Sequence, residues 1–172
     1  MKTFLLGLAA TLVISQAVAQ IPKADEVAIR QTVQRMVGNY QDHKFADMAT
    51  YTTPDVSWVN IVGMWWRGRP AVQQAHQQIF DSIFTGVDFK PGAVTVRAIT
   101  PDVAVVNMYC HVGAFYPPDG VNRGTNKEGD SDDLLTLVMV KKQGKWLLTA
   151  GQNTVVRASA EPFDPVKLVD RH

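Results

Sequence analysis

Two polar side chains stand where the surrounding pattern predicts buried positions, and both could take part in chemistry. His76 lies in a run of apolar residues at helical spacing, so its ring is predicted to face the protein interior. A histidine there can act as a general acid or base, because its ordinary pKa lies near neutrality. It can equally line a pocket, or it can bond a backbone carbonyl or Asn60 and serve only the fold. The sequence leaves these three roles open.

Asn60 is the second candidate, since its amide can polarise a carbonyl group or hold a water molecule, although it cannot take up a proton at ordinary pH. Trp58 precedes it by two positions in a predicted strand, so the two side chains are expected to share a face. Phe80 follows His76 by about one helical turn and shares its face. Aromatic walls with a few convergent polar groups are typical of a pocket for a small ligand.

Three helices are predicted to precede the sheet and to position these residues. The first, over residues 24–42, carries apolar side chains at intervals of three and four residues. The second is short, covers residues 45–51 and is expected to end before Pro54. The third contains His76, opens with Pro70 in its first turn and is expected to end at Gly86.

The remaining pattern predicts strands. Residues 56–62 and 64–67 indicate a strand and a short returning strand, and four longer candidates follow at 94–99, 103–115, 134–142 and 146–156. Long strands with short turns between them predict an antiparallel sheet. The polar segment 117–133, rich in Gly and Pro, is predicted to be a loop.

Both faces of the predicted strand from Leu134 to Val140 are apolar, which is unusual for an antiparallel sheet with one face in water. One face can pack on the helices, and we expect a second copy of the chain to cover the other, giving a homodimer through the sheet. Asn107, Tyr109 and His111 share one face of their strand, and this polar face is predicted to be the outer one.

The N-terminus has the three parts of a signal peptide. Lys2 supplies the positive charge, residues 4–14 form an apolar run, and Ala17 and Ala19 fit the cleavage rule. The run is too short for a stable membrane-spanning helix, which argues against an uncleaved anchor. We therefore predict that residues 1–19 are removed and that the protein is exported, either periplasmic or secreted. Because Cys110 is the only cysteine, no internal disulfide can form.

Several classes of partner are predicted to be absent. The chain has 17 basic and 16 acidic residues, and this balance predicts neither nucleic-acid binding nor membrane association after cleavage. The four histidines lack metal-ligand spacing, and the group of Asp130, Asp132 and Asp133 lacks the glycine register of a calcium loop, so we expect no metal and a solvated loop. No phosphate-binding or dinucleotide motif is present, so no cofactor is expected. Cys110 is predicted to be a small buried side chain.

The order of these elements resembles the nuclear transport factor 2-like superfamily, and within it the SnoaL-like group, particularly its exported SgcJ/EcaC-type members. The segments that carry the resemblance are residues 55–63, residues 66–69, His76 and residues 144–154, within a match over residues 24–157. The resemblance implies an α+β fold in which a cone-shaped, curved antiparallel sheet wraps around three N-terminal helices. Residues 158–172 would then form a surface tail.

The resemblance also implies a pocket between the helices and the concave face of the sheet. Its lining would include Tyr40, Trp58, Asn60, Trp66, His76 and Phe80, together with Gln152 and Asn153, of which one should face the pocket. Ketosteroid-isomerase chemistry is not expected, because Asn60 and Met36 stand where that branch has its carboxylate base and its tyrosine. The strand from Leu134 to Val140 offers no carboxylate either.

Three functions remain open, and the first is the preferred one. It is an exported domain that binds a small, mostly apolar or aromatic molecule. The second is a cofactor-free enzyme of the isomerase, dehydratase or cyclase type, with His76 as acid and base and Asn60 polarising a carbonyl group. The third is a structural dimerisation module whose cone is filled by its own side chains.

Overall fold

The computed structural model describes residues 21–165, so the predicted signal peptide and the end of the tail lie outside the described residues. The elements in order are α1 (Lys23–Asp42), the 3₁₀ turn η1 (Met48–Thr50), β1 (Thr52–Val59), β2 (Trp65–Arg67), α2 (Arg69–Phe80), β3 (Phe89–Thr100), β4 (Val103–Phe115), β5 (Glu128–Lys142), β6 (Lys145–Val155) and the 3₁₀ turn η2 (Ala158–Phe163). No helix within residues 21–165 is long and apolar enough to cross a membrane.

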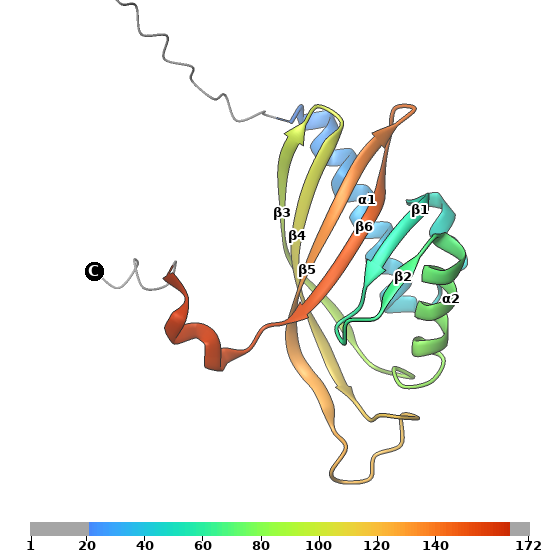
Figure 1. Cartoon of the computed structure of the whole chain (residues 1–172), viewed down its shortest axis with the longest axis vertical. Coiled ribbons are helices and arrows are strands. Elements are labelled where there is room, and N and C mark those ends of the chain that lie inside the picture. Colours follow the sequence, from blue (N-terminus) through green and yellow to red (C-terminus); the bar gives the residue numbers. More distant parts are fainter. Residues whose placement is uncertain (1–20, 166–172) are drawn as a thin grey trace, which may run out of the picture.

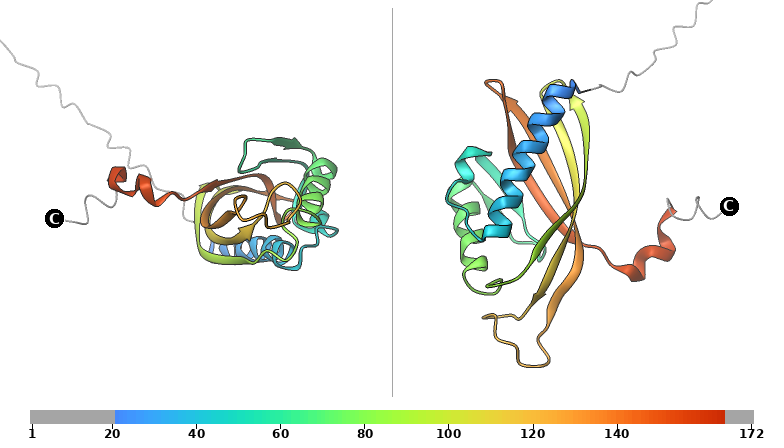
Figure 2. Two further views of the ribbon diagram at one scale, coloured as in Figure 1. Left: turned by 90° about the horizontal axis from the view of Figure 1, so that it is seen from below. Right: turned by 180° about the vertical axis from the view of Figure 1, so that it is seen from behind.

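The predicted α+β class with a curved sheet and N-terminal helices is confirmed. Six strands form one sheet in the order β2-β1-β6-β5-β4-β3, with α1 along its concave side and α2 beside β1 and β2 (Figure 1). Seen from below, the strands curl into a cone between the two helices (Figure 2). The expectation of a purely antiparallel sheet is wrong at one place, because β1 and β6 run parallel. Sequence spacing gives no sign of this pairing, since 85 residues separate the two strands.

The second predicted helix is largely wrong, and the segment expected to end it belongs to a strand. Only the three residues of η1 are helical, and β1 already begins at Thr52. Pro54 is tolerated in this strand because it is exposed and lies where the register between β1 and β6 shifts. The third helix is also shorter than predicted, since α2 ends at Phe80 and turns connect it to β3.

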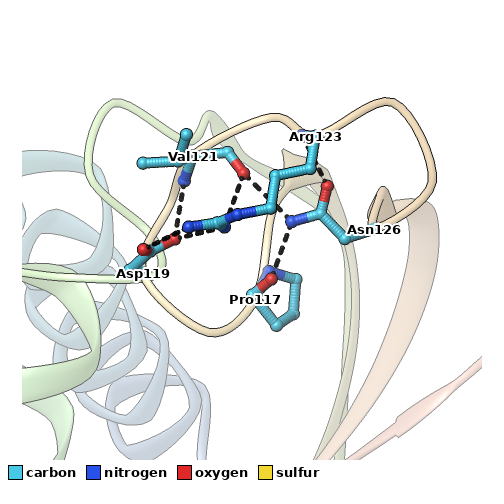
Figure 3. A network of polar contacts seen from close by, with 5 residues as sticks. All are labelled: Pro117, Asp119, Val121, Arg123 and Asn126. Carbon is cyan, nitrogen blue, oxygen red and sulfur yellow. Dashed lines mark hydrogen bonds and ion pairs between the residues drawn. The ribbon is translucent and has the colours of Figure 1, made fainter.

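The predicted loop over residues 117–133 is shorter than expected, because β5 begins at Glu128. Residues 116–127 form the connection, at the lower end of the molecule in Figure 1. Several of its polar contacts lie within the connection itself: Arg123 pairs with Asp119 at 2.7 Å, and the amide of Asn126 donates to the carbonyl of Pro117 at 2.7 Å (Figure 3). The polar composition that predicts a loop therefore serves to fix this turn internally.

Helix α1 is held against the sheet by polar contacts as well as by its apolar stripe. Thr32 donates to the backbone carbonyl of Trp146 at 2.9 Å, and the carboxylate of Asp25 accepts from the indole of Trp146 at 2.9 Å. Asp25 also forms an ion pair with Lys141 at 2.8 Å, which lowers the pKa of its carboxyl. These contacts fix the helix across the hairpin of β5 and β6.

The outer face of the sheet carries both apolar and polar side chains. Leu134, Val138 and Val140 are only half-buried there, and Tyr109 is 50% exposed. Asn107 lies on the same face and donates to Thr136 at 3.0 Å, which confirms the predicted outer position of this polar group. The homodimer through this face stays a prediction.

The concave face depends on one close approach between a tryptophan ring and a glycine. Trp58 on β1 and Gly151 on β6 are neighbours in the parallel register, and the indole lies directly over the glycine. A Cβ atom at position 151 would overlap three atoms of the Trp58 ring. Only glycine therefore lets this ring lie flat against the sheet, where it forms part of the cone interior.

We predict that Gly151→Ala destabilises the protein by about 2 kcal/mol, because the methyl group must displace the buried ring of Trp58. Gly38→Ala is the matched control, since no atom lies within 4 Å of a Cβ there and alanine suits a helix interior. The control should keep or raise the free energy of unfolding in urea. Equal stability of the two variants would contradict the role assigned to Gly151.

Candidate functional site

The cone contains a cavity of about 550 Å³ between the concave face of the sheet, α2 and the hairpin of β1 and β2. Exposed residues such as Val62, Glu128 and Arg157 border it, so it opens to solvent. Seven aromatic side chains line it: Tyr40, Trp58, Trp66, Phe80, Phe84, Phe89 and Phe115. The cone is therefore not filled by its own side chains.

Most of the residues proposed for a pocket lie around this cavity. Tyr40, Trp58, Asn60, Trp66, His76, Phe80 and Asn153 all border it. Gln152 does not, so Asn153 is the one of the two that faces the cavity: Gln152 is exposed on the outer face, because neighbouring residues of β6 point to opposite sides of the sheet. Trp65 likewise points away from Trp66 and is 61% exposed, with the guanidinium of Arg67 over its ring.

His76 is buried, and both of its ring nitrogens have partners within the fold. Nδ1 lies 2.8 Å from the carbonyl of Val72, which can only accept, so Nδ1 carries the proton. Nε2 then accepts from the hydroxyl of Tyr40 at 2.7 Å. Burial lowers the pKa of His76 to about 4, so the ring is neutral at ordinary pH. This geometry favours a role in lining the cavity and supporting Tyr40 over a role in acid and base catalysis.

Asn60 lies just beyond the end of β1, not on it, and so does not share a strand face with Trp58. Its side-chain oxygen accepts from the backbone N–H groups of Met64 at 2.8 Å and Val62 at 3.2 Å. These bonds shape the turn between β1 and β2. The amide oxygen is thus committed to the backbone, and only the NH₂ group of Asn60 is left to meet a ligand.

The prediction that Asp133 lies in a solvated loop is wrong, because this residue belongs to β5 and is a site residue that was not predicted from the sequence. It lies on the concave face of β5, borders the cavity and is 3% exposed. Asn153 on β6 donates to its carboxyl group at 3.1 Å. Burial, followed by the nearby charge of Asp132, raises the pKa of the Asp133 carboxyl. The sequence did hold a signal for the inward orientation of Asp133. This residue lies two positions before the apolar Leu135, and strand residues two apart share a face.

Cys110 lies opposite Asp133 in the register of β4 and β5 and also borders the cavity. It is buried, as predicted, and burial raises the pKa of its thiol to about 12. The thiol is therefore protonated at ordinary pH and is not an activated nucleophile. Within residues 21–165, no group of His, Cys, Asp and Glu side chains could hold a metal ion.

Comparison with known proteins places the chain in a family. The sequence pattern of the SnoaL-like domain matches residues 29–155. The chain belongs to the SnoaL-like domain family. No curated protein matches it.

Solved structures agree with this assignment. An uncharacterised protein with a cystatin-like fold from Caulobacter vibrioides is 31% identical, with a TM-score of 0.76 over 83% of this chain and 96% of that one. A nuclear transport factor 2-like protein from Streptomyces avermitilis, provisionally called a dehydratase, is 19% identical, with a TM-score of 0.63 over 80% of this chain and 99% of that one. At that identity the second likeness shows the fold alone.

The buried, neutral His76 should make stability fall in mild acid. The unfolded chain takes up a proton at this residue near its ordinary pKa of about 6.5, whereas the folded chain does so only near pH 4. The contribution of the neutral ring to the free energy of unfolding is therefore complete above the pKa of the unfolded chain. It is lost as the pH falls toward 4, and the loss amounts to about 3 kcal/mol.

Urea denaturation across this pH range checks the prediction by comparing the protein with its His76→Gln variant, which lacks the titrating ring. The difference in unfolding free energy between the two should shrink as the pH falls. A difference that does not change with pH would contradict the neutral, buried state of His76.

Proposed function

We propose that this SnoaL-like domain is an exported binding protein that holds a small, mostly apolar or aromatic molecule in its cone. The observation that carries the proposal is the cavity itself, which combines aromatic walls with the buried carboxyl group of Asp133 and its half-buried partner Asn153. Membership of the exported SgcJ/EcaC-type subgroup stays a prediction within it.

The dimensions and chemistry of the cavity suit such a ligand. A volume of about 550 Å³ lies within the range of pockets for small molecules, which are mostly apolar with a few placed polar groups. Rings from both helices and from the sheet would take the apolar body out of water. Asp133 and Asn153 would orient its polar end. A purely structural module would have little use for an unfilled cone, so the third function is disfavoured.

Filling the cavity should abolish binding without unfolding the domain. Val112 borders the cavity on β4, and Val112→Trp would place an indole in the space that a ligand needs. Thermal-shift measurements with a panel of small aromatic compounds should give stabilising hits for the native protein, which become at least about tenfold weaker in the variant.

Val105→Trp is the matched control, because it adds the same ring to a half-buried position on the outer face of the same strand. Its hits should match those of the native protein. Unchanged binding in Val112→Trp would place the ligand elsewhere.

A cofactor-free enzyme is the second candidate, and Asp133 rather than His76 favours it. A carboxyl group in an apolar cavity with a raised pKa is closer to the range in which a group can both give and take a proton near neutrality. His76 has both nitrogens engaged by Tyr40 and Val72. Isomerisation, dehydration and aldol-type cyclisation each need one such group beside the substrate.

Deuterium exchange tests this candidate without knowledge of the substrate. Small aromatic ketones incubated with the protein in D₂O should take up deuterium next to the carbonyl group, as followed by NMR. Asp133→Asn should lower the rate by about a hundredfold or more, whereas Asp102→Asn, in the exposed turn between β3 and β4, should not change it. Equal rates with and without protein would contradict catalysis of this kind.

A further inference from the structure

The carboxyl group of Asp133 is buried without a counter-ion. Its side-chain hydrogen-bond partner is the neutral amide of Asn153, at 3.1 Å. None of the ion pairs within residues 21–165 involves Asp133, and the nearby charge of Asp132 repels a further negative charge there. An ionised carboxylate in an apolar space is costly unless a cation compensates it. Among residues 21–165 no cationic side chain forms an ion pair with this carboxyl group, and His111 acts on it only from the outer face.

Most of the charged groups around the cavity are carboxyl groups. Its lining holds three carboxyl groups, those of Asp88, Glu128 and Asp133, and a single guanidinium, that of Arg157. Arg157 is exposed at the border of the cavity, whereas Asp133 lies inside. His76 adds no charge, because burial keeps its pKa at about 4. In a chain whose total charge is balanced, this interior is locally negative.

The aromatic walls add to this preference. The negative face of an aromatic ring attracts a cation, and rings arranged around a space are the usual recognition site for ammonium groups with apolar substituents. Here Tyr40, Trp58 and Phe80 come from three different elements and border the same cavity. Their ring centroids lie 5.5 Å (Tyr40 to Phe80) and 6.4 Å (Tyr40 to Trp58) apart, so they form one connected wall.

We propose that the ligand of this cavity carries a positively charged nitrogen on an apolar or aromatic body, as in an arylalkylammonium ion, and that the nitrogen pairs with the Asp133 carboxylate. The inference rests on the proposed function and names the class of ligand. The ligand supplies the ion-pair partner that this carboxyl group lacks within residues 21–165, and Asn153 holds the carboxylate in position while the rings surround the substituents on nitrogen.

A neutral carbonyl ligand is the competing class, and the two differ in the sign of their pH dependence. A carbonyl oxygen needs a protonated Asp133 as donor and would bind less well as the pH rises through the pKa of this carboxyl. A permanent cation needs the carboxylate and would bind better over the same range. Burial and Asp132 raise that pKa above its usual value, so the change is displaced toward neutrality from the range of an ordinary carboxyl group.

Other titratable groups lie on or near the cavity wall, and of these the charge of His111 lowers the pKa of the Asp133 carboxyl whereas that of Asp132 raises it. Tyr40 on α1 and Cys110 on β4 have raised pKa values, and His76 on α2 titrates near pH 4. Asp88 and Glu128 are exposed at the border. His111 and Asp132 lie on the outer face, where they bond each other at 3.0 Å.

Three probes of similar shape separate the classes: trimethyl(2-phenylethyl)ammonium, 4-phenyl-2-butanone and 3-phenylpropionate. Isothermal titration with the mature protein should show the ammonium ion binding at least about tenfold more tightly than the ketone or the acid near neutral pH. Its affinity should rise as the pH is raised from acid toward neutrality, because its own charge is fixed and the Asp133 carboxyl group ionises.

Asp133→Asn keeps the shape of the side chain and removes its charge. The affinity for the ammonium ion should therefore fall by at least about tenfold, whereas the affinity for the ketone should change by no more than about twofold. Asp102→Asn, an exposed carboxylate remote from the cavity, should leave both unchanged. If Asp133→Asn fails to fold, the pH dependence in the native protein still decides.

Two results would overturn the inference in distinguishable ways. Ketone binding that equals or exceeds ammonium binding, or that falls as the pH rises, would reject the cationic ligand and leave the binding function intact. No binding of any probe class to a folded protein, together with no hit in the thermal-shift panel, would reject the binding function itself.

Discussion

The hydrogen bond between the hydroxyl of Tyr40 and Nε2 of His76 joins the two helices inside the cone. It satisfies the one ring nitrogen that the α2 backbone leaves open, and it fixes two rings edge to face with centroids 5.5 Å apart. Because α2 otherwise contacts mainly β1 and β2, this bond helps to hold the helix at a distance from the long strands. The cavity is the space that this separation leaves.

The polar groups inside the cone therefore fall into two kinds. Tyr40 and His76 satisfy each other and remain uncharged, so they act as wall and support. Asp133 and Asn153 are bonded to one another but border empty space, and the carboxyl group keeps an unmet preference for a cation or a proton. A buried polar group of the second kind costs stability unless a ligand compensates it, which is why we place the proposed ligand contact on β5 and β6.

The sequence allowed the element order, the α+β class and the inward position of His76 to be predicted, because helical and strand periodicities are local properties. The same locality explains the errors. Proline usually ends a helix, and only the irregular pairing with β6 makes room for Pro54 inside β1. Asp133 follows a glycine and an aspartate with left-handed backbone, Gly129 and Asp130, and such a polar run resembles a loop until β4 pairs with it.

The sequence by itself determined which strand residues point to the same face, which stripe of each helix is apolar and that no internal disulfide can form. Only the tertiary structure decided that β1 runs parallel to β6, that Gly151 lies under Trp58, and that a carboxyl group faces the cavity while Gln152 faces solvent. The physical reason is that burial is a property of partners distant along the chain. Periodicity shows that two faces exist, but the curvature and pairing of the sheet decide which face encloses the cavity.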